Sequence, residues 1–330
     1  MTVLVTGGTG FVGLNLAEAL LARGEPVVLA GLDQPPAPAL RRFRQLPGTL
    51  ATETVDVRDG AALEALFRRH QVTRLFPFAA VTSGPDRESV QPEAVFHVNL
   101  LGLIAQLQAA RAAGVWRVIV PSSSSVYGEA FYRLPELDED AACVPVSLYG
   151  ISKFAVERTG LRLGALWGLD VIAARIGALF GPWERDTGLR DTLSPFWQAA
   201  QLALQRREAA LPETLPTYSF VYARDAAAAL LWLLDLRDPP HRVFNICGGV
   251  DLRSALPGFC ARLAQAFPGF RYRTSHDSAE VNVQPSDPRP RGRMATGRLA
   301  HAGWTAAYGE DRACADYLYF LEHAADGPDA

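Results

Sequence analysis

The chain has 330 residues, of which 49% are hydrophobic, and a net charge of −3. This length suits one large α/β domain or a domain with a smaller lobe, and the charge excludes the strongly basic surface that binds nucleic acid or a membrane. Its cysteines lie too far apart in the sequence to suggest a zinc site or a disulfide framework. Its longest apolar run, Ala226 to Leu234, is too short to span a membrane, and the sequence shows no leader segment before the first strand. We therefore expect a cytoplasmic protein.

The first motif along the chain is a strand, a glycine-rich turn and a helix. Thr2 to Thr6 is apolar, and a helix is predicted from Leu14 to Arg23. Between them the sequence reads T-G-G-T-G-F-V-G, in the order of the dinucleotide fingerprint, with an ordinary strand-to-helix turn as the alternative. Glycines there permit a tight turn, close approach of a pyrophosphate and close helix packing, which indicates a cofactor site at Gly7, Gly10, Phe11, Val12 and Gly13.

The second predicted strand, Val27 to Ala30, leaves the choice of cofactor open. An acid commonly follows this strand and accepts the ribose hydroxyls. Here Gly31 follows the strand and Asp33 comes two residues later, from where it can still reach the ribose. The loop Pro35 to Pro47 carries Arg41, Arg42 and Arg44, which either meet a 2′-phosphate or lie in solvent. We expect NAD or NADP, with NAD slightly preferred.

Three further strands continue the alternation of strand and helix. A third strand closes at Thr54 to Asp59, where Asp56 is placed to accept a hydrogen bond from the adenine and Asp59 to cap the helix Gly60 to His70. The fourth, Leu75 to Phe78, ends in Ala79-Ala80, and the helix Pro92 to Ala113 carries Asn99. The fifth, Trp116 to Val120, leads into Ser122-Ser123-Ser124-Ser125-Val126-Tyr127-Gly128. The pattern predicts a Rossmann-type, doubly wound parallel sheet.

A helix predicted from Tyr149 to Trp167 carries a Y-x-x-x-K pattern. Tyr149 and Lys153 lie one turn apart on the same face. A nearby ammonium favours the phenolate and lowers the pKa of a tyrosine, so Tyr149 can exchange a proton with an alcohol or ketone held by a serine hydroxyl. Such a site belongs at the carboxyl ends of parallel strands, where the serines are expected.

The alternation changes after a sixth predicted strand, Val171 to Arg175. An irregular, proline-rich stretch runs from Gly181 to Thr217, and Ser219 to Tyr222, the helix Asp225 to Leu236 and Val243 to Ile246 are predicted to return to the sheet. The segment from Asp251 onward is predicted as short helices and loops. We therefore expect two interleaved units: a NAD(P)-binding domain of residues 1–176 and 219–248, and a smaller α/β substrate lobe of residues 177–218 and 249–330.

Taken together, these motifs resemble the extended short-chain dehydrogenase/reductase family, in its NAD-dependent epimerase/dehydratase group. The glycine turn, Asp56-Val57, Ala79-Ala80, Asn99, the serine run, Y-x-x-x-K, Gly181-Pro182, Phe220-Val221-Tyr222-Ala223-Arg224-Asp225 and Gly303-Trp304 carry the resemblance. It implies hydride transfer at a carbinol carbon, with Ser123, Tyr149 and Lys153 as the catalytic residues. It also implies a homodimer built from the helices around Pro92 to Ala113 and Leu148 to Trp167.

The resemblance extends the predicted binding sites to residues that the motifs alone do not assign. The cofactor site then also takes in Asp33, Asp56, Val57, Phe78, Ala79, Ala80, Asn99, Tyr149, Lys153 and Ile176. The substrate site takes in Thr82, Ser124, Ser125, Trp183, Arg185 and Arg190. Arg185 and Arg190 can hold a carboxylate or can be surface residues paired with Asp186 and Asp191.

Departures from the family pattern bear on the substrate. Ser124-Ser125 replace the Asp-Glu of dehydratases, which argues against elimination of water. Ala178 and Tyr218 replace an asparagine and an arginine that hold the diphosphate of nucleotide sugars. We therefore expect an NAD(P)-dependent oxidoreductase acting on a sugar or sugar acid, with a sugar or nucleotide-sugar epimerase as the first alternative and a non-catalytic dinucleotide-binding protein as the second. No metal is expected.

Overall fold

Seven parallel strands form the central sheet of the computed structural model, which describes residues 1–188, 191 and 193–324. In the sheet the strands run in the order β11-β7-β5-β4-β1-β2-β3, which confirms the doubly wound architecture. Their bounds are β1 Thr2–Thr6, β2 Pro26–Gly31, β3 Thr49–Thr54, β4 Val72–Pro77, β5 Arg117–Ser123, β7 Asp170–Ile176 and β11 Val243–Ile246.

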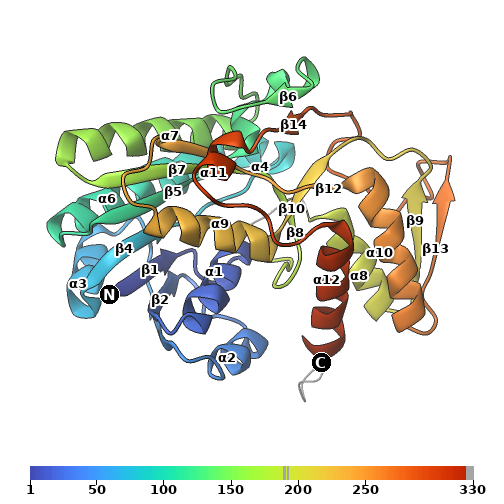
Figure 1. Cartoon of the computed structure of the whole chain (residues 1–330), viewed down its shortest axis with the longest axis horizontal. Coiled ribbons are helices and arrows are strands. Elements are labelled where there is room, and N and C mark those ends of the chain that lie inside the picture. The colour runs from blue at the N-terminus through green and yellow to red at the C-terminus, as the bar shows by residue number, and fades with distance from the viewer. Residues whose placement is uncertain (189–190, 192, 325–330) are drawn as a thin grey trace.

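Helices cover both faces of this sheet because its strands are apolar on both sides. Helices α1 (Phe11–Ala22), α2 (Ala37–Phe43) and α9 (Ala223–Asp235) share one core with the sheet. Helices α3 (Gly60–His70), α6 (Gly102–Ala112) and α7 (Leu148–Trp167) share the core on the other face (Figure 1). The prediction of a loop at α2 was wrong: its Ala39 and Phe43 are buried against α1, and a proline in its first turn suits a helix start.

A smaller lobe lies at one end of the sheet, on the right in Figure 1. Its core is formed by α8 (Pro195–Leu204), α10 (Leu252–Ala266) and α12 (Glu310–Ala324), together with paired strands β9 (Glu208–Pro212) and β13 (Arg271–Ser275). Two of these helices are 15 residues long, whereas short helices were expected, because each buries an apolar face in this core.

Strand β10 (Ser219–Tyr222) corrects another expectation. It pairs with β8 (Ala178–Phe180) and β12 (Val250–Asp251) in a separate three-stranded sheet and does not rejoin the central one. The remaining elements are short: α4 Pro85–Val90, α5 Pro92–Phe96, α11 Gly297–His301, the paired strands β6 Glu136–Leu137 and β14 Arg293–Met294, a π-helical turn His97–Leu101, and 3₁₀ turns Ser124–Val126 and Glu129–Tyr132. Among the described residues, no helix is both long and apolar enough to cross a membrane.

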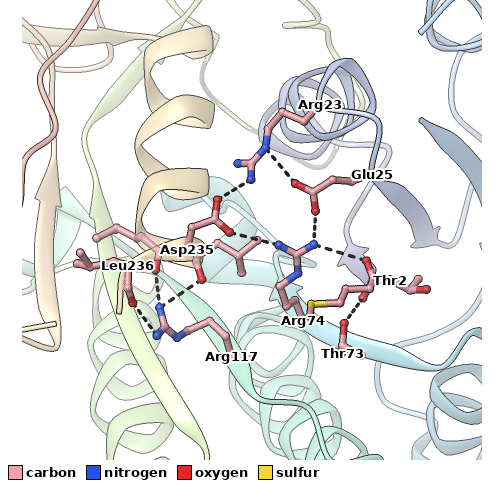
Figure 2. Close-up of polar contacts among 11 residues, drawn as sticks. Thr2, Arg23, Glu25, Thr73, Arg74, Arg117, Asp235 and Leu236 are labelled. Carbon is pink, nitrogen blue, oxygen red and sulfur yellow. Dashed lines mark hydrogen bonds and ion pairs between the residues drawn. The ribbon is translucent and has the colours of Figure 1, made fainter. Parts of the chain in front are cut away.

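A network of charged side chains joins the amino ends of the central strands (Figure 2). Arg74 of β4 is buried and pairs with Glu25 and Asp235, while Arg23 pairs with the same two carboxylates. Arg117 at the start of β5 donates to the carbonyls of Leu233 (2.7 Å) and Leu236 (2.8 Å), and so satisfies the end of α9. These contacts hold together the amino-terminal ends of the strands, at the opposite end of the sheet from their carboxyl ends.

Candidate active site

The glycine turn has the geometry that a dinucleotide phosphate requires. Gly7 has φ +60°, and the Gly10 amide donates to the Gly7 carbonyl at 2.9 Å. The N-cap residue of α1 is Gly10, which has no side chain, and the first turn of the helix holds no acid, so this helix end suits an anion. A Cβ on Gly7 would lie 2.7 Å from the backbone of Ala79, which places Phe78 and Ala79 directly beside the turn. These features fit the dinucleotide that the motif implies.

The adenosine side of this cleft differs from the usual pattern. β2 ends in Gly31, and Asp33 is exposed in the loop after it. The Asp56 carboxylate already accepts hydrogen bonds from the Arg58 amide (2.9 Å) and guanidinium, which lower its pKa. Val57 is buried against Gly102 at the start of α6. Asp56 can still offer an oxygen to adenine, but its charge is shared with Arg58.

Asn99 lies in the π-helical turn between α5 and α6. Its amide group exchanges hydrogen bonds with both backbone groups of Val81, at 2.8 and 3.1 Å, and donates to the Ser152 hydroxyl at 3.0 Å. Asn99 was predicted to contact the cofactor. In the structure it ties the segment after β4 to α7, the helix that carries the proposed catalytic pair, and its contact with a cofactor stays a prediction.

The proposed catalytic residues come from two packed elements. Ser123 ends β5, and its hydroxyl oxygen accepts from the Ser125 amide at 3.1 Å and lies 3.3 Å from the Ser125 hydroxyl. Tyr149 is in the first turn of α7, and the Lys153 Nζ lies 5.8 Å from its ring centroid. A Cβ on Gly150 would lie 2.7 Å from the Ser125 carbonyl, so this end of α7 rests directly on the serine turn.

The Lys153 ammonium is buried beneath Tyr149. Burial lowers the pKa of Lys153 to about 8, and its Nζ donates to the Pro121 carbonyl at 3.0 Å. Pro121 has no N–H, yet it lies in an inner strand of the sheet. The strand tolerates it because the pairing of β4 with β5 ends at Leu75 and Val118, before Pro121. At the end of β7, Ile176 pairs with Ser123, so β5 and β7 end at the same level.

A buried ion pair that the sequence analysis did not identify supports these elements from behind. The Glu157 carboxylate, one turn after Lys153, accepts from Arg175 at 2.8 and 2.9 Å and from the Ser122 hydroxyl at 2.7 Å. Arg175 also donates to the Tyr127 hydroxyl at 3.0 Å. Burial raises the pKa of Tyr127 to about 12, so this tyrosine is a structural member of the network. The sequence did carry a signal for this ion pair, because Glu157 follows Tyr149 and Lys153 at the same four-residue spacing on one helix face.

The predicted substrate residues separate into distinct places. The serine turn Ser124–Ser125 directly follows Ser123 at the end of β5, whereas Thr82 lies in the segment after β4, where its carbonyl accepts from the Asp191 amide at 3.3 Å. Trp183 is not at the site: it packs in the core against Phe43 and Phe320 and donates to Glu18 at 2.8 Å. Arg185 donates to the Thr9 carbonyl of the glycine turn at 2.9 Å. Arg190 lies outside the described residues.

An open hollow of about 770 Å³ lies against α4. Its walls include Asp86 and Arg87 of α4 together with Asp186, Asp191 and Ser286. Arg87 pairs with Asp191 at 2.9 Å across it. Glu88, on α4, accepts from the Tyr149 amide at 3.0 Å, so α4 connects this hollow to α7. Among the described residues, no cluster of side chains could hold a metal ion.

Comparisons with known proteins agree with this geometry. The sequence model of the NAD dependent epimerase/dehydratase family matches residues 3–247. The chain is 31% identical to UDP-glucose 4-epimerase of Mus musculus over 95% of this chain and 94% of that protein, and 30% identical to that of Yersinia pestis over 76% and 78%. The crystal structure of UDP-glucose 4-epimerase of Thermus thermophilus with NAD superposes with a TM-score of 0.76 at 26% identity, covering 98% of this chain and all of that one.

Proposed function

The chain belongs to the NAD-dependent epimerase/dehydratase family of extended short-chain dehydrogenases/reductases, and on that basis we propose that it moves a hydride at a secondary alcohol or ketone carbon of a sugar. The observation that carries this proposal is the juxtaposition of Ser123, Tyr149 and Lys153 at the carboxyl ends of β5 and β7, beside an uncapped glycine turn.

A nicotinamide dinucleotide, when bound, supplies the hydride acceptor or donor. The residues of this chain handle the proton and the position of the substrate. Ser123 offers a hydroxyl to the substrate oxygen, and Tyr149 takes the proton from that oxygen or returns it. Lys153 places an ammonium next to Tyr149 in a buried setting, where a charge acts more strongly than in water. The hydroxyl of Ser125, 3.3 Å from that of Ser123, helps to orient it.

The substrate we propose is a sugar or sugar acid with an anionic group. Tyr218 stands where family members carry an arginine for a diphosphate, yet Arg291 lies with its guanidinium 4.5 Å from the Tyr218 ring centroid and donates to the Tyr218 hydroxyl at 3.0 Å. Arg291 therefore brings a guanidinium from another segment of the chain to the position of Tyr218. Asp287 pairs with Arg291 at 3.2 Å and with Arg289 at 2.9 Å, so the two guanidiniums and one carboxylate carry one net positive charge, which suits one carboxylate better than a diphosphate.

A second candidate is the epimerase, which oxidises and re-reduces one carbon with its cofactor retained. The relatives named UDP-glucose 4-epimerase support it, because one of them matches over nearly the whole of both chains. Both candidates use the same three catalytic residues. They differ in the outcome: the first changes the redox state of added dinucleotide, and the second interconverts stereoisomers without net change.

The test is a substrate panel with each outcome measured separately. Purified protein is given UDP-glucose, UDP-galactose, free sugars and sugar acids; net oxidation is followed by absorbance of the reduced nicotinamide, and epimers are separated by chromatography. In the active pairing, Tyr149→Phe should lower turnover at least ~100-fold with little change in dinucleotide affinity. Tyr319→Phe, exposed on α12, is the control. Retained turnover in Tyr149→Phe would refute the assignment of the acid/base.

The homodimer also remains a proposal. Leu101, Ile151 and Leu166, on and beside α6 and α7, are exposed apolar side chains on the helical face that the resemblance implicates. Charged replacements of Ile151 and Leu166 should shift the protein to a monomer in sedimentation experiments. The cytoplasmic location and the division into two interleaved units likewise remain predictions.

A further inference from the structure

Arg185 reaches from the segment after β8 onto the glycine turn. Its Nη2 donates to the Thr9 carbonyl at 2.9 Å. The residues before it are fixed by α1: the Asn15 amide donates to the Pro182 carbonyl at 2.8 Å, and Trp183 donates to Glu18 at 2.8 Å. The position of Arg185 is therefore set by the fold and does not depend on a free surface loop.

Thr9 lies on the side of the turn that faces the end of β2. The Gly8 amide donates to the Ala30 carbonyl at 3.2 Å, and a Cβ on Gly31 would lie 3.5 Å from the Thr9 hydroxyl oxygen. In this fold, an acid at the end of β2 accepts the ribose 2′-hydroxyl of NAD, whereas an arginine nearby accommodates the 2′-phosphate of NADP. No acid directly follows β2 here, since Asp33 comes two residues later and is exposed, and Arg185 contacts the same threonine that borders Gly31.

The charge on Arg185 is not neutralised by the protein. Among the described residues no carboxylate pairs with it, and its buried Nε has no hydrogen-bond partner. A guanidinium has five N–H donors, and a carbonyl such as that of Thr9 accepts without offsetting the charge. Arg42 of α2, by contrast, is paired with Glu18 at 3.0 Å. Arg185 is thus the better placed of these two cations for an added phosphate.

We propose that Arg185 binds the 2′-phosphate of NADP(H), so that this enzyme prefers NADPH to NADH. The proposal rests on the dinucleotide site of the proposed function but not on the role of Tyr149. Binding alone tests it, so a failure of the catalytic assignment would leave its result unaffected.

The experiment measures dissociation constants for NADPH and NADH, and for 2′,5′-ADP and 5′-AMP as probes of the phosphate alone. Wild-type protein should bind NADPH and 2′,5′-ADP at least ~10-fold more tightly than their counterparts. Arg185→Ala should weaken both phosphorylated ligands ~10- to 100-fold and change NADH and 5′-AMP by less than ~3-fold. Arg41→Ala, an exposed arginine of α2, is the matched control.

A second variant restores the acid. Gly31→Asp fits, because its Cβ would make only ordinary contacts, and it should weaken NADPH and strengthen NADH. Three results would overturn the proposal: tighter binding of NADH by the wild type, equal losses for both dinucleotides in Arg185→Ala, or loss of NADPH selectivity in Arg41→Ala but not in Arg185→Ala. Arg185→Gln replaces Arg185→Ala if urea unfolding shows that the latter is unstable.

Discussion

Removing the charge of Glu157 should cost the protein a large part of its stability. Its side chain is fully buried and accepts two hydrogen bonds from Arg175 and one from Ser122. Glu157→Gln keeps the shape but removes the one carboxylate that, among the described residues, is hydrogen-bonded to the Arg175 guanidinium, which is 5% exposed. Breaking one partner of a buried pair costs about 3–5 kcal/mol, about a fifth or more of the 5–15 kcal/mol stability of a typical domain. Urea unfolding followed by tryptophan fluorescence measures the loss.

Two controls separate the buried pair from the substitution itself. Glu64→Gln removes a carboxylate from Arg68 at the surface, where both side chains are half exposed or more, and should cost less than about 0.5 kcal/mol. The double variant Glu157→Leu with Arg175→Met removes both charges and should recover most of the loss. A cost below about 1 kcal/mol for Glu157→Gln, or no recovery in the double variant, would show that the pair does not carry the energy assigned to it.

Two further predictions concern the lysine and the glycine turn. Burial lowers the pKa of Lys153 from 10.5 to about 8, so the folded state disfavours its ammonium. Without added dinucleotide, the free energy of unfolding of the wild type should therefore rise relative to that of Lys153→Met, by roughly 3 kcal/mol as the pH rises from 7 to 10.5. Urea titrations measure this difference, and a difference that does not change with pH would contradict the burial. Gly7→Ala would place a Cβ 2.7 Å from the Ala79 backbone at a residue with φ +60°, and it should lower dinucleotide affinity at least ~10-fold. The control is Gly24→Ala, at φ +78° with open space around it, which should cost only about 1 kcal/mol of stability and leave dinucleotide affinity unchanged. Equal affinity for Gly7→Ala and wild type in a fluorescence titration would refute the close approach.

The sequence predicted what depends on local periodicity and turn chemistry. The alternation of apolar strands and helices, the glycine turn and the Tyr149–Lys153 spacing are local features, and the central sheet followed from them. The misplacement of Ser219–Tyr222 has a different origin, since strand partners are chosen by contacts between distant segments. The positions of Trp183 and Arg185 depend on α1, about 170 residues earlier in the chain, and no spacing in the sequence reports such contacts.

The π-helical turn at His97–Leu101 makes the number of residues in this segment matter as much as their identity. Such a turn contains one residue more than an α-helical turn, and each residue advances an α-helix by about 100°. Deleting one residue there would restore a regular helix but swing Asn99 away from Val81 and Ser152. A single-codon deletion between His97 and Leu101 should therefore leave a helical protein in which Asn99 no longer joins the loop after β4 to α7.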